Sequence, residues 1–196
     1  MNLRPLRFRI VGVGLIGGLS VGALAVRELS RVGVHQGYSP DQPIAFPHRV
    51  HSGENKIPCL YCHYGARMSR HAGIPSASIC MNCHKMLEKQ TVQIEKLREA
   101  VQMQRPIRWV RVHTLPDFVS FNHSRHVLSG VMCQRCHGPI ETMDRVRQVA
   151  PLTMGWCLDC HRERAHLPTS SIRRAMLSPS EKGSPTAGMD CSSCHY

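Results

Sequence analysis

Five copies of one short pattern, C-x-x-C-H, constrain this chain more than any other feature. They occupy residues 59–63, 80–84, 133–137, 157–161 and 191–195, called motifs 1 to 5 below, and they account for all ten cysteines. Two thiols at this spacing reach the two vinyl groups of one porphyrin, and the imidazole that follows coordinates the iron from the same side. The pattern therefore predicts five covalently bound haem c groups.

The motifs also predict which residues hold each haem. Thioether bonds are expected at Cys59, Cys62, Cys80, Cys83, Cys133, Cys136, Cys157, Cys160, Cys191 and Cys194. The expected proximal iron ligands are His63, His84, His137, His161 and His195.

Other uses of paired cysteines fit the pattern poorly. Zinc sites take C-x-x-C units two at a time, and five is an odd number. A thioredoxin-like redox motif occurs once in a domain, and a structural disulfide has no use for the histidine. Histidine makes up 13 of the 196 residues. Its presence after all five pairs by chance has a probability on the order of 10⁻⁶.

Five porphyrins also account for the composition. Aromatic residues make up only 5% of the chain, and the formal net charge is +12. The macrocycles replace the missing aromatic core, and their propionates bring about ten negative charges. We therefore expect no nucleic-acid partner, and we predict a mostly irregular fold with short α-helices.

A second pattern, F-x-H-x-x-H, precedes motif 1 at 46–51 and motif 3 at 121–126. The offset is 75 residues from His48 to His123, 74 from Cys59 to Cys133 and 77 from Cys80 to Cys157. This internal repeat predicts two modules with two haems each, 40–104 and 105–168, and a tail at 169–196 with the fifth haem.

The repeat also predicts distal iron ligands. Two histidines three residues apart point in similar directions and reach different haems, so we expect His48, His51, His123 and His126 to be distal ligands. The fifth iron is expected to take His113 or His71. His35 and His166 are expected at the surface or as hydrogen-bond partners. Met154 and Met143 are the alternative sixth ligands, or they pack against the porphyrins.

Irons with two protein ligands have no open position for a substrate, so we expect electron transfer and no substrate-converting site. Pentahaem nitrite reductases open one iron with a C-x-x-C-K variant, which this sequence lacks. Reductase activity is therefore the minor alternative.

The N-terminus predicts export. Arg4, Arg7 and Arg9 precede seventeen uncharged residues, 10–26. The segment is a signal peptide cleaved after Ala25 or an uncleaved transmembrane anchor, and we expect the anchor because Met1 is retained. The arginines predict a cytoplasmic N-terminus and haems on the periplasmic side of the inner membrane. Residues 27–39 are expected to be a linker.

Two further segments carry predictions. Gly14, Gly18 and Gly22 form a stripe that lets helices approach closely, which predicts docking onto another membrane subunit. Glycines are also common in such segments without this role. Apolar residues at helical spacing predict a helix over 85–104, which ends before Pro106.

The sequence resembles a known family at several places. The residues are F-P-H-R-V-H at 46–51 with motif 1, A-G-I-P at 72–75 with motif 2, V-H-T-L-P-D at 112–117, F-N-H at 121–123 and M-G-W-C at 154–157. They resemble the pentahaem membrane-anchored cytochrome subunit of alternative complex III. Each half also resembles the small multihaem cytochromes of class III, c3 and c7.

The resemblance implies a menaquinol:acceptor oxidoreductase. In such complexes membrane subunits oxidise the quinol, and an iron–sulfur subunit, this cytochrome and a monohaem cytochrome c lie on the periplasmic face. The chain would carry electrons to a soluble acceptor, a small cytochrome c or a copper protein. The alternatives are a stand-alone quinol dehydrogenase with one anchor and a soluble pentahaem shuttle to a reductase.

Overall fold

The computed structural model describes residues 4–29, 31–87, 91–165 and 188–195. His166 and most of the predicted tail lie outside these ranges. The chain divides into two compact units, Met1–His35 and Gln36–Tyr196. All five motifs belong to the second unit.

The first unit contains the helix α1 (Arg4–Leu29). Its 26 residues span about 39 Å at 1.5 Å per residue, enough for a hydrocarbon core of about 30 Å. The window Gly12–Leu29 has a mean hydropathy of 1.4 and no buried residue. By length and composition this is one helix that qualifies to cross a membrane, and a signal sequence meets the same conditions.

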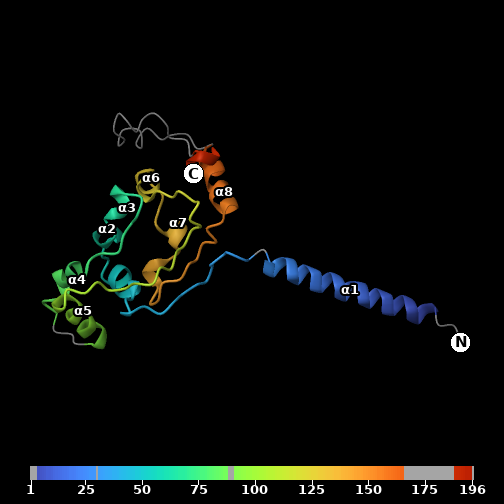
Figure 1. Ribbon diagram of the computed structural model, residues 1–196, viewed down its shortest axis with the longest axis horizontal. Coiled ribbons are helices and arrows are strands. Elements are labelled where there is room, and N and C mark those ends of the chain that lie inside the picture. Colours follow the sequence, from blue (N-terminus) through green and yellow to red (C-terminus); the bar gives the residue numbers. More distant parts are fainter. Residues whose placement is uncertain (1–3, 30, 88–90, 166–187, 196) are drawn as a thin grey trace. The chain divides into compact units, whose positions relative to one another are not determined.

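The second unit consists of short helices joined by long irregular segments (Figure 1). Its described elements are η1 (Arg49–Glu54), α2 (Cys59–Cys62), α3 (Gly65–Met68), α4 (Ala77–His84), α5 (Val92–Gln102), α6 (His123–Leu128), α7 (Gln134–His137), η2 (Ile140–Thr142), α8 (Met154–Ala165) and η3 (Cys191–Ser193). The described ranges contain no strand, only one isolated antiparallel bridge between Val119 and His195. The prediction of short helices in an irregular chain is confirmed.

The helix predicted over 85–104 is shorter than expected. It begins at Val92, because Thr91 has an extended backbone and its Oγ1 accepts a hydrogen bond from the Ile94 amide at 3.3 Å. Such an N-cap satisfies one of the free amides at a helix start. The preceding helix α4 ends at His84, and α5 packs against it with Leu97 buried.

The two predicted modules pack against each other through their helices. Helix α3 contacts α6, and the amides of His123 and Ser124 donate to the carbonyls of Arg70 and Ser69 at 3.2 and 3.1 Å. Turn η1 contacts η2, where the amide of Arg49 donates to the carbonyl of Met143 at 2.9 Å. The module boundaries thus remain a prediction from the repeat, while the packing joins both modules in one unit.

Part of the predicted linker 27–39 is bound to the second module. The Gly37 amide donates to the Gln148 carbonyl at 2.7 Å, and the Gln148 amide donates to the Tyr38 carbonyl at 3.0 Å. The Ser39 hydroxyl donates to the Val146 carbonyl at 3.0 Å. From Gln36 onwards the chain therefore belongs to the folded unit.

The polypeptide buries few of its own side chains. Among the described residues, the buried apolar side chains are Ala66, Leu97, Met143 and Ala150. Gln148 is also buried, at 1% exposure. A domain of this size ordinarily buries a much larger apolar core. The protein side chains alone do not supply the interior that holds these helices together.

Candidate haem sites

A turn of helix presents the three chemical groups of each motif. Motifs 1 and 3 coincide with the short helices α2 and α7, motifs 2 and 4 lie in α4 and α8, and motif 5 lies at η3. The amides of His63, His137 and His195 donate to the carbonyl of the first cysteine of their motifs at 2.9, 3.0 and 2.8 Å. Residues three and four apart share a helix face, so both thiols and the imidazole point to one side. All ten thiols are free of disulfides.

Four motif histidines each face a histidine of an F-x-H-x-x-H pattern. In the first module the ring centroids of His48 and His63 are 6.5 Å apart, and those of His51 and His84 are 6.0 Å apart. The second module repeats this arrangement, with His123 at 6.5 Å from His137 and His126 at 6.1 Å from His161.

These separations fit an iron between the two rings. An imidazole nitrogen binds a metal at about 2.0–2.1 Å, so two rings on opposite sides of one metal have their centroids about 6 Å apart. Direct stacking would bring the rings closer, as in the pair Phe46 and His51 at 4.1 Å. The ring planes differ by 8° and 10° at motifs 1 and 3 and by 55° and 49° at motifs 2 and 4. The internal repeat is therefore reproduced in the ligand geometry.

The phenylalanine of each F-x-H-x-x-H pattern fixes both of its histidines. Phe46 meets the ring of His48 edge-on at 4.9 Å and stacks on His51 at 4.1 Å. Phe121 meets His123 edge-on at 4.8 Å and stacks on His126 at 4.5 Å. Aromatic pairs in these geometries contribute about 0.5–1.5 kcal/mol beyond area burial. Each phenylalanine thus holds two imidazoles in different orientations, toward the histidines of two different motifs.

Backbone carbonyls fix the tautomer of most of these imidazoles. A carbonyl oxygen only accepts hydrogen bonds, so an Nδ1 that faces one carries the hydrogen, and Nε2 is left free to bind a metal. The Nδ1 donors, with their acceptor carbonyls, are His51 to Pro47 at 2.9 Å, His63 to Gly73 at 2.7 Å, His123 to Arg70 at 2.8 Å, His126 to Asn122 at 2.8 Å, His161 to Gly188 at 2.7 Å and His195 to Phe118 at 3.2 Å. Nδ1 of His48 is buried without such a partner.

Two of these histidines are held neutral by their surroundings. Burial, followed by the charges of His63 and His51, lowers the pKa of His48 from 6.5 to about 4. Burial and then neighbouring histidines, His113 first, lower the pKa of His137 to about 4. The neutral imidazole is the form that coordinates a metal. The set of donors and their spacing fit haem iron at motifs 1 to 4.

The remaining candidate ligands lie elsewhere. Nε2 of His113 is 3.3 Å from Nδ1 of His137, so the structure places it behind motif 3 rather than at motif 5. His71 is exposed, with its amide donating to Ser69 Oγ at 3.0 Å. Met143 is buried at 4% exposure, and Met154 is 66% exposed at the start of α8. His35 is exposed in the first unit.

The motifs lie near one another in a definite order. In the thiol form, burial and then the charge of a cysteine in another motif raise the pKa of one cysteine between each two neighbouring motifs. The pairs are Cys62 with Cys83, Cys133 with Cys59, Cys136 with Cys160, and Cys157 with Cys194. Cys133 and Cys59 also share a side-chain hydrogen bond. Neighbouring motifs therefore follow in the order 2, 1, 3, 4 and 5. Exposed cysteines, Cys83 and Cys191, occur only in the two end motifs.

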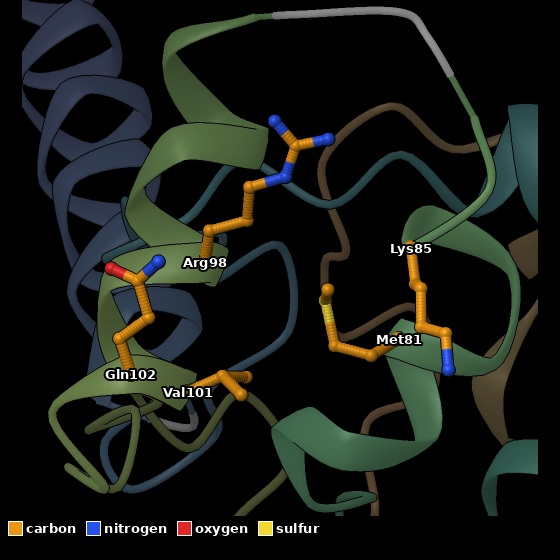
Figure 2. Close-up of a pocket in the computed structure, with 5 residues that line it drawn as sticks. All are labelled: Met81, Lys85, Arg98, Val101 and Gln102. Atoms are coloured by element: carbon orange, nitrogen blue, oxygen red, sulfur yellow. The ribbon is translucent and has the colours of Figure 1, made fainter.

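A pocket of about 320 Å³ lies beside motif 2. Figure 2 shows Met81 of α4 and Lys85, the residue that follows α4, on one side of the pocket and Arg98, Val101 and Gln102 of α5 on the other. Burial, followed by His51 and Arg98, lowers the pKa of His84 in the same region. Lys85 and Arg98 place two basic side chains in the lining of this pocket.

Sequence comparison agrees with this geometry. Residues 119–196 match the family described as cytochrome c7 and related cytochromes c. The chain is also similar to the multihaem cytochrome c subunit of menaquinone reductase from Nitratidesulfovibrio vulgaris, with 32% identity over 127 residues. That alignment covers 64% of this chain and 56% of the relative, so the chain spans little more than half of the relative's length. Both similarities support covalent haem c and electron transfer by a multihaem chain.

The features that sequence reasoning missed are the groups that hold the facing histidines. The carbonyls of Gly73 and Arg70 accept hydrogen bonds from His63 and His123, and the imidazole of His113 lies at hydrogen-bond distance from His137. A carbonyl has no side-chain signature. The V-H-T-L-P-D stretch did single out His113, though in a different role.

Proposed function

We propose that this chain is a pentahaem c-type cytochrome that relays electrons within a membrane complex oxidising menaquinol. The observation that carries the proposal is the set of four facing imidazole pairs at 6.0 to 6.5 Å. Haem c supplies the reversible iron(III)/iron(II) couple when it is bound.

The residues divide the work at each haem. The two cysteines of a motif would hold the porphyrin, and the motif histidine would bind the iron. His48, His51, His123 and His126 would be the second protein ligands at motifs 1, 2, 3 and 4. With two protein ligands each, these irons would have no position for a substrate and no ligand to exchange on reduction. They are suited to electron transfer alone.

For the fifth haem we propose His71 as the distal ligand of the iron bound by His195. Arg70 Nη2 donates to the Ser120 hydroxyl at 2.9 Å, and the Ser120 amide donates to the Cys194 carbonyl at 2.7 Å. These bonds bring the segment that contains His71 beside motif 5. His113 is engaged behind motif 3, and Met143 is packed in the interior.

The order of neighbouring motifs supports a linear chain of haems, in the sequence 2, 1, 3, 4, 5. Motifs 1 and 3 are neighbours at its centre and belong to different modules. The end motifs 2 and 5 carry the exposed cysteines, so their haems are the entry and exit points for electrons.

Two observations support membership of a membrane complex: the similarity to the multihaem subunit of menaquinone reductase and the apolar helix α1. The relative from Nitratidesulfovibrio vulgaris is named as a menaquinone reductase subunit. We propose the corresponding role in alternative complex III, with membrane quinol-oxidising subunits, an iron–sulfur subunit and a monohaem cytochrome c as partners. A small cytochrome c or a copper protein is the acceptor. Helix α1 is the single-pass anchor, with its arginine-rich N-terminus in the cytoplasm.

Purification through an affinity tag on this chain tests the assignment. We expect several polytopic membrane subunits to co-purify with it and the complex to transfer electrons from menaquinol to a soluble cytochrome. Gly18→Leu should lower the yield of those subunits, because it fills the glycine stripe, while Gly17→Leu on another face serves as control.

Other outcomes would replace the proposal. A lone active dimer would indicate a stand-alone quinol dehydrogenase. An intact mass that corresponds to cleavage after Ala25 would indicate a soluble shuttle. If Gly18→Leu and Gly17→Leu give equal yields of the co-purified membrane subunits, the glycine stripe does not mediate docking.

A further inference from the structure

Motifs 1 and 3 occupy equivalent places in the two modules, yet their proximal histidines are supported differently. The facing rings are 6.5 Å apart in both, with interplanar angles of 8° and 10°. Behind His63, Nδ1 donates to the carbonyl of Gly73 at 2.7 Å. Behind His137, Nδ1 faces Nε2 of His113 at 3.3 Å. One haem is thus supported by the main chain and its counterpart by a side chain.

The difference follows from the N-terminal part of the second unit. The repeat offset of 75 residues, which relates His48 to His123, maps Gly73 onto Gln148. The Gln148 carbonyl accepts a hydrogen bond from the Gly37 amide at 2.7 Å. The next carbonyl, of Val149, accepts from Gln36 Nε2 at 2.8 Å. The segment 36–39 therefore engages the carbonyls that would correspond to Gly73.

The same N-terminal region holds His113 in position. Gln42 makes two hydrogen bonds with the backbone of Val110, one to its carbonyl and one from its amide, both at 2.9 Å. His113 is three residues further along and partly buried, and its ring meets that of His137 edge-on at 4.4 Å. Both observations indicate a fixed imidazole whose Nε2 is directed at the ligand.

We propose that His113 is a positioning residue for the haem of motif 3, which accepts a hydrogen bond from Nδ1–H of His137 and thereby lowers the reduction potential of that haem. The inference rests on the proposed role of His137 as an iron ligand. A hydrogen bond to the far nitrogen fixes the ring orientation and makes the imidazole a stronger donor to the metal. A stronger donor stabilises the oxidised iron, so the bond favours the ferric state.

Potentiometric titration of the purified holoprotein, followed by optical and EPR spectra, tests this role. His113→Phe fills the same space without an acceptor, and one of the five midpoints should move to higher potential while the other four stay in place. His113→Gln offers an amide oxygen as acceptor and should move that midpoint back toward the wild-type value. His35→Ala, an exposed histidine of the first unit, is the matched control and should leave all five midpoints unchanged.

Defined results would overturn the inference. Unchanged midpoints in His113→Phe, at full haem content, show that His113 does not tune the haem. A shift of all five midpoints, or a shift that His113→Gln does not reverse, shows a structural role only. If the phenylalanine variant loses haem, His113→Ala removes the acceptor with less bulk and takes its place. The proposed function itself has a different test. It is refuted if the motif 3 peptide of the wild-type protein, analysed by mass spectrometry, carries no haem.

Discussion

Replacing one distal histidine should change one haem and leave the others intact. His126 is suited to this test because its ring faces His161 at 6.1 Å and its Nδ1 bond goes to the Asn122 carbonyl, at the start of the same helix. His126→Ala therefore removes one ligand with a local change. With five motifs, one per haem, about one fifth of the low-spin ferric signal should convert to high spin. Low-temperature EPR of the oxidised holoprotein, integrated against total haem, gives this fraction directly.

Two further substitutions serve as comparisons for the EPR result of His126→Ala. His35→Ala should leave the low-spin signal complete, because His35 lies in the first unit. His71→Ala should also convert about one fifth, at motif 5, if His71 is the fifth distal ligand. An unchanged low-spin signal in His126→Ala would refute the assignment of the facing pairs. Conversion of two or more haems would show that the ligands are not assigned one to each iron.

Two further predictions concern stability. Gly53→Ala should destabilise the second unit by about 1–3 kcal/mol, because the added methyl would overlap the Glu141 carbonyl where η1 meets η2. Gly155→Ala, with no atom within 4 Å of the added methyl, should be neutral or slightly stabilising, and equal chemical denaturation midpoints for both variants would contradict the packing. Burial lowers the pKa of His48 from 6.5 to about 4, and binding of iron would act in the same direction, so the unfolded chain binds the proton first as the pH falls. Stability should therefore be constant for this group above pH 6.5 and decrease by at most about 3 kcal/mol as the pH falls to 4. Denaturation midpoints that rise over this interval would contradict the buried, neutral imidazole.

Local patterns predicted part of the geometry of the site. The F-x-H-x-x-H repeat named four histidines that the structure brings opposite motif histidines. The thioether cysteines and proximal histidines named by the motif spacing stay predictions. The facing histidines could be named from spacing because each pattern lies within one or two turns of chain. The short helices were predictable for a similar reason, since covalent haem leaves little chain for long elements.

Long-range contacts set the limits of prediction. The position of His113 depends on the bonds of Gln42 to Val110, 68 residues away, and no local pattern reports them. The start of α5 was misplaced because apolar spacing continued through Leu87, while the cap at Thr91 determines the boundary. The partner of each F-x-H-x-x-H histidine likewise depends on how η1 and α6 pack, which spacing left open.

The number of electrons that the purified chain accepts is the most direct test of the central claim. An anaerobic coulometric titration of the fully oxidised holoprotein, normalised to polypeptide concentration, counts them. One haem c at each C-x-x-C-H motif predicts five electrons per chain, all taken up by haem in the optical spectrum. Fewer than five electrons per chain, in protein with all ten motif cysteines intact, would contradict the account.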